Sequence, residues 1–246
     1  MQVVKTELLE LLRRNDLLRA ALLVGRIQDS AFKEGPFVEQ IMELAARVWH
    51  RSVRGKHDVI LKLENINAVL FREFGLHGKN DRYKQVIDDP YRYYIHSVLK
   101  KKVGSPLAVT ILYLILAEQV GIEYECLALP SYYLLKVRDP NGEIYIDIFD
   151  SGKFLSEEEF HRKFRSALQR NRMLSTSLFE RVSAGQLIAR LVQQLKHIYI
   201  LKGSAVEALR AVELLTAIFP QSPELTRDRG ILYCEMEYFS RAMEDL

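Results

Sequence analysis

Cysteine is scarce in this chain, which has only Cys126 and Cys234 among its 246 residues. Two cysteines so far apart form neither a disulfide framework nor a metal-binding motif, so we expect two reduced, buried thiols. Long apolar runs are missing as well, because no stretch reaches the roughly 18 apolar residues of a membrane-spanning helix. The amphipathic N-terminus lacks the apolar segment of a signal peptide. These absences predict a cytoplasmic protein without a membrane span.

An excess of one charge is also absent. Lysine and arginine number 35 and aspartate and glutamate 32, a net charge of +3, so nucleic acid is not the expected partner. No glycine-rich loop indicates a nucleotide, and no spacing of histidine, cysteine and acidic residues indicates a metal. We therefore expect neither a cofactor nor a metal ion.

The most informative stretch that is present is GSPLAVTILYLILAEQVG, residues 104–121. Ser105 is a good helix N-cap and Pro106 suits the first helical position, while Gly121 is typical of a helix end. From Leu107 to Ala117 only Thr110 and Tyr113 carry polar side-chain atoms. A helix that is apolar on every face is buried, so this stretch predicts the central core helix of the protein.

Three strand-like runs follow the central helix: Ile122–Leu129, Tyr132–Arg138 and Ile144–Phe149. The turn sequence DPNG at residues 139–142 predicts a hairpin between the last two runs. A buried helix that leads into an antiparallel sheet is the core of several cysteine-hydrolase folds. With the amphipathic helices predicted elsewhere, the fold class is α+β, mostly helical, with a small antiparallel sheet.

Further helices are predicted on both sides of this core. Apolar residues recur at helical spacing within residues 2–52 and again within 57–74. Ser156 and Glu159 form a capping box, which begins a helix that reaches about Leu168.

The last third of the chain is repetitive. Four residue pairs share an offset of 34 positions, the period of paired tetratricopeptide helices: Tyr199 and Tyr233, Ala208 and Ala242, Ile198 and Leu232, and Leu209 and Met243. A solenoid needs about three repeats, so these repeats must pack on the preceding domain, or the native chain continues. We predict a helical region at 1–55, a domain with the central helix and the sheet at 56–180 and repeats at 181–246.

Several motifs occur in a distinctive order and spacing: NAVLFREFGLHG (67–78), DDPYRYYIHSVL (88–99), the central helix, LPSYYLLKV (129–137), IDIFDSGKFLS (146–156) and the repeats from Ala189 onward. Together they resemble the bacterial invasion-regulator-like (SirB-type) family, a transglutaminase-like domain, here residues 56–180, followed by tetratricopeptide repeats. The resemblance covers roughly residues 60–246, and residues 1–55 match more loosely.

The resemblance implies three catalytic positions: a cysteine at the start of the central helix, a histidine on one following strand and an acid on the next. The cysteine position falls at or beside Pro106, where this family usually has proline, and the histidine position falls at Tyr132. Asp147 matches the acid. Tyrosine, with a usual pKa near 10, is a poor general base at neutral pH. We therefore predict no catalytic residue, only remnants at Ser105, Pro106, Tyr132 and Asp147.

Other candidate groups are weaker. Cys126 lies in a strand and is expected to be a buried structural thiol. His77 and His96 are expected in surface loops or turns, and His161 and His197 on the polar faces of helices.

Three functions remain open. The first is a non-catalytic transglutaminase-like protein that binds a protein or peptide partner through its repeats, whose stacked helices offer a groove. The second is a hydrolase or acyltransferase that uses Ser105 with Asp147, although Ser105 is more simply an N-cap. The third is a nucleic-acid-associated regulator, which needs two basic groups on one face: Lys100–Lys102, and Arg162, Lys163, Arg165, Arg170 and Arg172. The sequence does not predict the oligomeric state.

Overall fold

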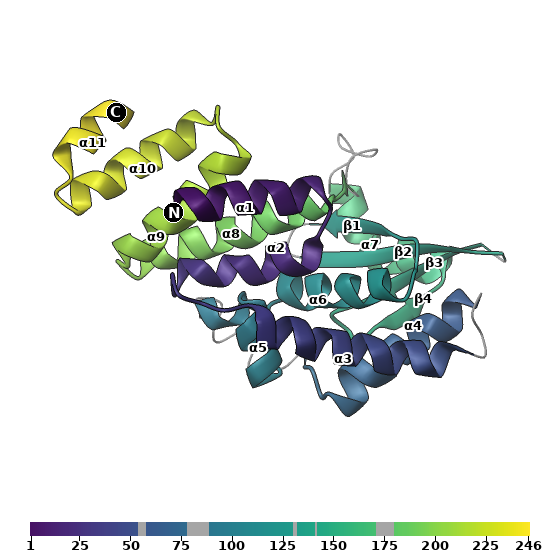
Figure 1. The fold of residues 1–246 in the computed structure, drawn as a ribbon. Helices are drawn as coiled ribbons and strands as arrows, with labels where there is room; N and C mark the ends of the chain where they lie inside the picture. Colours follow the sequence, from purple (N-terminus) through teal and green to yellow (C-terminus); the bar gives the residue numbers. More distant parts are fainter. Residues whose placement is uncertain (54–57, 78–88, 130–131, 141, 171–179) are drawn as a thin grey trace.

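A computed structural model describes residues 1–53, 58–77, 89–129, 132–140, 142–170 and 180–246 (Figure 1). It is mostly helical, with one small antiparallel sheet, as the sequence predicts. No helix in these ranges is long and apolar enough to cross a membrane.

The helices that precede the core follow the predicted amphipathic segments. They are α1 (Gln2–Arg13), α2 (Leu17–Leu23) with the 3-10 turn η1 (Val24–Ile27), α3 (Gly35–Ser52), α4 (Val59–Asn67) with the π-helical turn η3 (Ala68–Glu73), the 3-10 turn η5 (Pro90–Arg92), and α5 (Ile95–Lys101). The helix predicted over 57–74 thus changes to π geometry in its last part. Gly75 follows it with a φ of +74°, which favours glycine.

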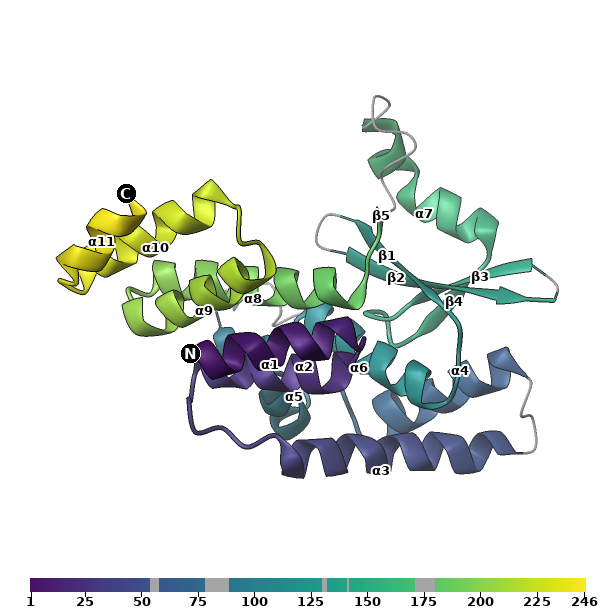
Figure 2. The same ribbon diagram turned by 45° about the horizontal axis from the view of Figure 1, so that its top comes forward.

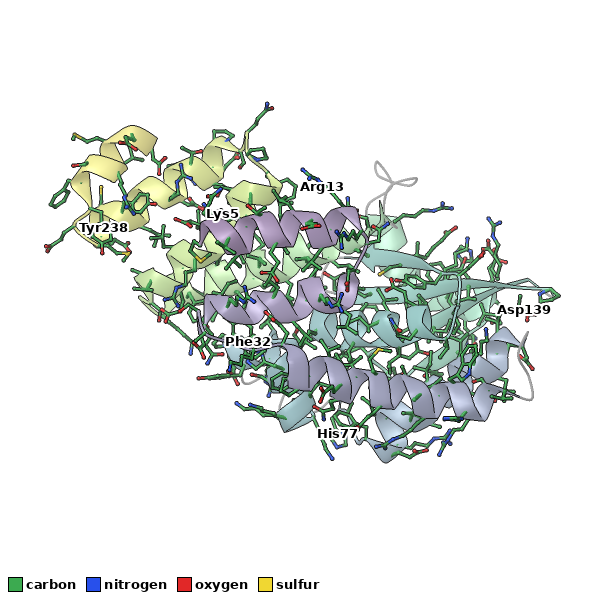
Figure 3. All side chains as sticks on the ribbon, viewed as in Figure 1. Lys5, Arg13, Phe32, His77, Asp139 and Tyr238 are labelled. Atoms are coloured by element: carbon green, nitrogen blue, oxygen red, sulfur yellow. The ribbon has the colours of Figure 1, made fainter. Side chains whose placement is uncertain are left out.

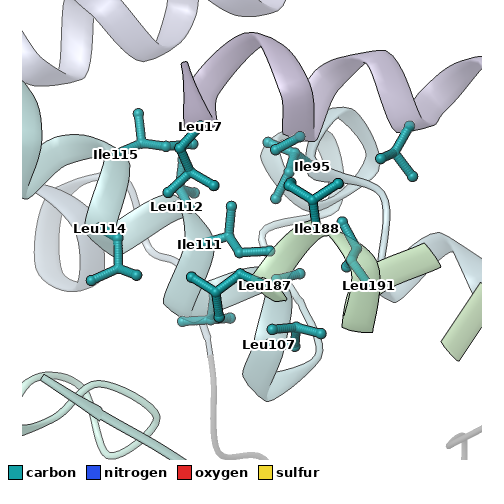
Figure 4. Packing of buried hydrophobic residues seen from close by; sticks show 14 of the residues in the cluster. Leu17, Ile95, Leu107, Ile111, Leu112, Leu114, Ile115, Leu187, Ile188 and Leu191 are labelled. Carbon is teal, nitrogen blue, oxygen red and sulfur yellow. The ribbon is translucent and has the colours of Figure 1, made fainter. Parts of the chain in front are cut away.

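The central helix is α6 (Pro106–Gln119), and its predicted ends are confirmed. The Ser105 Oγ accepts a hydrogen bond from the Ala108 N–H at 3.1 Å, Pro106 is the first helical residue, and Gly121 has a φ of +66°. Every residue of 107–117 is buried. Figure 4 shows why: side chains of α2, α5 and α8, such as Leu17 and Ile188, surround the helix.

The sheet contains the three predicted strands and two that the sequence did not reveal. In the order β4-β3-β2-β1-β5, all pairs antiparallel, the strands are β4 (Lys153–Leu155), β3 (Gly142–Asp147), β2 (Tyr132–Asp139), β1 (Glu125–Leu129) and β5 (Glu180–Arg181). The first strand begins at Glu125 rather than at Ile122. β4 and β5 are too short to show a period of two. The hairpin between β2 and β3 is confirmed, although Asn141 of its turn lies outside the described residues.

Two helices cover opposite faces of the sheet. Figure 2 shows α6 on one side and α7 (Glu157–Arg170) on the other. The Ser156–Glu159 capping box at the start of α7 is present, with reciprocal hydrogen bonds of 3.0 and 3.2 Å. Successive side chains of a strand point to opposite faces. In β2, Tyr133 and Leu135 therefore join the main core around α6, whereas Tyr132 and Leu134 join a small cluster under α7.

The repeat region forms two helical hairpins, α8 (Ala184–Leu201) with α9 (Ala205–Ile218), and α10 (Pro223–Glu235) with α11 (Phe239–Asp245). Ala208 and Ala242, one period apart, are both buried. Gly230 of α10 lies so close to α11 that an added Cβ would stand 2.6 Å from Leu246. Cys234 is exposed, contrary to prediction, whereas Cys126 is buried as expected.

The N-terminal hairpin packs on the repeats. α1 and α2 lie beside α9 and α8 (Figure 1), and Lys5, labelled in Figure 3, forms an ion pair with Glu213 of α9 at 3.2 Å. Arg210 of α9 donates to the Ile27 carbonyl at 3.1 Å. The hairpins α1–α2, α8–α9 and α10–α11 thus pack in series, so the sequence-distant first hairpin supports the two repeats. The division at residues 55 and 180 stays a prediction.

Candidate functional site

Two of the predicted remnants meet at a corner of the sheet that faces α7. The Asp147 side chain is fully buried, and its Oδ2 accepts hydrogen bonds from the Tyr132 hydroxyl and the Lys163 ammonium. Its Oδ1 accepts a hydrogen bond from the Asp150 N–H at 3.1 Å. The Lys163 Nζ also lies 3.1 Å from the Tyr132 hydroxyl. We call Tyr132, Asp147 and Lys163 the carboxylate corner.

The charges and hydrogen bonds of the carboxylate corner are suited to stabilising the fold rather than to transferring a proton. Burial raises the pKa of Tyr132 above its usual value, and the hydrogen bond to Asp147 raises it further. Tyr132 therefore stays protonated at neutral pH and acts as a donor. Lys163 supplies the counter-charge that a buried carboxylate requires. Both oxygens of Asp147 already accept hydrogen bonds, so the carboxylate is held in place on every side.

Ser105 lies elsewhere. Its Oγ caps α6, its backbone N–H donates to the Arg92 carbonyl at 2.8 Å, and the residue is 1% exposed. α6 packs on the sheet face opposite to the one from which Tyr132 and Asp147 reach α7. Among the described residues no hydrogen bond joins Ser105 to the corner. Pro106 has no nucleophilic side-chain atom, and the Ser105 Oγ accepts the capping hydrogen bond of α6.

A second polar junction was not predicted from the sequence. Asn67, at the end of α4, donates to the Gly152 carbonyl at 2.8 Å and accepts from the Tyr113 hydroxyl of α6 at 3.0 Å. Gly152 has a φ of +74°, and a Cβ there would stand 1.9 Å from the Asn67 Oδ1. The junction therefore joins three of the resembling motifs. Tyr113, one of only two residues with polar side-chain atoms in the stretch 107–117, was the available signal.

His96 was predicted in a surface loop or turn, and this is wrong. It lies in α5, 9% exposed, among the rings of Phe32, Phe37 and Tyr94. Burial, helped by the charge of Lys100, lowers its pKa to about 4. Its Nδ1 has no hydrogen-bond partner among the described residues, so the ring is a neutral core group at neutral pH. His77, His161 and His197 are exposed, as predicted.

The two basic groups lie in different parts of the molecule. Lys100 and Lys101 end α5 and Lys102 is its C-cap; each ammonium stands over an aromatic ring, 4.2 to 5.3 Å from its centre. Lys163 is bound to Asp147, and Arg162 is exposed. Arg172 and the side chains of Arg165 and Arg170 lie outside the described residues. Figure 2 shows α7 above the sheet and α5 in the lower middle of the molecule, below α1 and α2.

A metal site would need a cluster of side chains of the kind that bind metals. In the part of the chain that the structure describes, no three histidine, cysteine or acidic side chains come together in a way that could hold an ion. The buried Cys126 thiol has its pKa raised to about 12 by burial, which makes it unreactive.

The domain that contains these residues matches a known superfamily. The sequence model of the transglutaminase-like superfamily matches residues 36–193, well over half of the chain. The chain belongs to the transglutaminase-like superfamily. A tetratricopeptide-repeat model matches residues 195–246. The matched core runs from α3 into α8 and contains both the carboxylate corner and the Asn67 junction.

Curated relatives agree with the resemblance found in the motifs. A UPF0162 protein of Xylella fastidiosa is 25% identical over 189 residues, which cover 76% of this chain and 66% of the relative. Protein SirB1 of Salmonella typhimurium is 23% identical over 185 residues, 75% of this chain and 67% of that protein. F-box only protein 21 of Mus musculus is 26% identical over 182 residues, 70% of this chain and 27% of that protein. This transglutaminase-like chain thus spans about two thirds of the bacterial relatives. No solved structure is significantly similar to it.

Proposed function

We propose that this transglutaminase-like chain is non-catalytic and acts as a protein-interaction module through its repeat region. The observation that carries the proposal is how the remnants of the catalytic positions are hydrogen-bonded. Ser105 caps α6 through its Oγ, whereas Tyr132 and Asp147 are bound to each other and to Lys163 on the opposite face of the sheet. An acyl-transfer site needs its nucleophile, base and orienting acid within hydrogen-bond reach, and this arrangement favours a role in stability.

Exposed apolar side chains in the last hairpin support the second part of the proposal. Phe239 and Met243, one turn apart on α11, are 61% and 78% exposed, and Tyr238, labelled in Figure 3, is 50% exposed. Tetratricopeptide repeats generally bind other proteins, and the cluster gives this region an apolar contact surface.

The catalytic half is tested by assays of the purified chain with fluorogenic esters and amides and with amine incorporation into a glutamine-containing protein. We expect rates equal to those of Asp147→Ala and Ser105→Ala variants that remain folded. A turnover that either substitution abolishes would favour the hydrolase or acyltransferase alternative and refute the non-catalytic assignment.

The interaction half is tested by quantitative crosslinking in the source cells. A Phe239→Ser/Met243→Ser variant should lose the crosslinked partners of the parent chain, whereas Glu235→Gln/Glu244→Gln, which changes exposed polar residues of the same hairpin, should keep them. Equal partner sets for all three chains would contradict a role for the repeat surface.

A further inference from the structure

A pocket of about 360 Å³ lies where α1, α2 and the start of α3 meet, and none of its lining residues belongs to the carboxylate corner or to the last hairpin. Its volume lies in the range of ligand-binding pockets, roughly 300–1,000 Å³. The lining residues are Glu7 and Leu11 of α1, Arg19 and Leu23 of α2, and Glu34, Gly35, Val38 and Glu39 at the start of α3. The functions considered so far use none of these residues.

The apolar part of the pocket comes from one side chain on each helix, Leu11, Leu23 and Val38. Leu23 is 1% exposed and belongs to the main core. Gly35 borders open space, since a Cβ built on it would meet no atom within 4 Å. Leu11 and Val38 are half-buried, so the pocket presents a small apolar surface against which an alkyl chain can pack.

The charged part of the pocket is mainly negative. Three carboxylates, Glu7, Glu34 and Glu39, face one guanidinium, that of Arg19. Arg26 forms ion pairs with Glu7 at 2.9 Å and with Glu34 at 3.0 Å, and so holds both in place. Arg19 forms an ion pair with Asp16 of its own helix at 3.4 Å.

Glu39 is the carboxylate left for a ligand. It is exposed, and no ion pair joins it to another of the described residues. Together with the half-neutralised Glu7 and Glu34, which share a single Arg26, it gives the pocket unsatisfied negative charge beside an apolar surface.

We propose that this pocket binds a lysine or arginine side chain from a basic segment of a partner protein. Such a side chain combines an alkyl stem, which covers apolar surface, with a cationic head that stays polar. The stem fits against Leu11, Leu23 and Val38, and the head forms charge-assisted hydrogen bonds with the carboxylates. An acidic or purely apolar side chain would leave the carboxylates unpaired. This site is separate from the repeat surface, so the two proposals fail independently.

The test is a titration of the isotopically labelled full chain with the capped peptide acetyl-Gly-Arg-Gly-amide, followed by amide chemical shifts. We expect saturable shifts at Glu34, Gly35 and Glu39. The peptide with citrulline in place of arginine, which keeps the shape and loses the charge, should cause none. Equal shifts with both peptides would overturn the proposal.

Variants place the binding in the pocket. Gly35→Phe, which fills the open space, should abolish the shifts, and Glu39→Gln should weaken binding about threefold or more, the size expected of one exposed charge pair. Glu43→Gln, an exposed carboxylate one turn further along α3, is the matched control and should bind as the parent does. Equal affinity of the Glu39→Gln and Glu43→Gln variants would refute the proposal even if Gly35→Phe fails to fold. Spermidine that binds more tightly than the peptide, and displaces it, would identify a free polyamine as the occupant and overturn it as well.

Discussion

The two faces of the sheet differ in the size of the apolar core that covers them. The face toward α6 belongs to a large core that extends to α5, where His96 is neutral and its Nδ1 has no partner among the described residues. The face toward α7 covers a cluster of a few side chains, where Asp147 is saturated by Tyr132 and Lys163. A large core tolerates an orphaned polar atom because its apolar burial far exceeds the cost, whereas a small cluster depends on its ion pair.

The largest expected effect compares adjacent leucines of β2. Leu135 faces the large core and Leu134 the small cluster, and both are fully buried. Leu135→Ala should lower the free energy of unfolding by about 4 kcal/mol, and Leu134→Ala by about 2 to 3 kcal/mol, because a small cluster can collapse into the space left behind. Denaturant unfolding measures both variants. Equal losses would show that the faces do not differ in packing.

The next prediction concerns the ion pair of the carboxylate corner, whose two partners are replaced one at a time. Lys163→Met leaves the fully buried Asp147 without its counter-charge and should cost about 3 kcal/mol. Asp147→Asn should cost less, about 1 to 2 kcal/mol, because Lys163, 36% exposed, can turn to water while asparagine still accepts hydrogen bonds. Thermal unfolding of the two variants decides the order. If Asp147→Asn is the more destabilising variant, the buried carboxylate does not need Lys163 as its counter-charge.

A third prediction concerns pH. The pKa of His96 is lowered to about 4, so between pH 6.5 and 4 the unfolded chain binds a proton that the folded chain does not. Stability should fall as the pH falls through this window, by on the order of 2 to 3 kcal/mol from this group. His96→Phe, which suits the surrounding rings, should remove that part of the loss.

Because other groups titrate in the same window, the informative quantity is the difference between parent and His96→Phe unfolding free energies at pH 7 and pH 4. His161→Phe, which changes an exposed histidine, is the control. If the difference does not change with pH, His96 is not held neutral by the core.

The smallest effect is expected at the start of α6. Ser105→Ala removes the acceptor for the Ala108 N–H and should cost about 1 kcal/mol, the usual value of an N-cap. Thermal unfolding measures it, and Ser105→Asp, which restores an acceptor, should recover part of the loss. A stability unchanged by Ser105→Ala would mean that the cap is unimportant.

Several features could be predicted from local sequence. The caps of α6, its burial, the β2–β3 hairpin and the 34-residue period each depend on residues close together in the chain or on a repeated spacing. Strands of two or three residues, such as β4 and β5, could not be found, because they are shorter than the pattern that reveals a strand.

The candidate site was only half predictable. The alternation along β2 places Tyr132 and Tyr133 on opposite faces, but both faces are apolar, so the sequence could not say which of them meets α6. The sequence also could not show which residue pairs with Asp147. Lys163 was one of five basic residues near one another, and only the packing of α7 brings it to the carboxylate.

By itself, then, the sequence determined the elements whose apolar pattern is local. These are a central helix that is apolar on every face, two strands joined by a recognisable turn, and a helical hairpin that repeats after 34 residues. Tertiary structure alone decided which sheet face carries Asp147, that the α1–α2 hairpin supports the repeats, and that a carboxylate-rimmed pocket opens between α1, α2 and α3. The physical reason is that periodicity and capping act over a few residues. Face, partner and cavity depend on groups brought together from distant parts of the chain, whose energies the local pattern does not record.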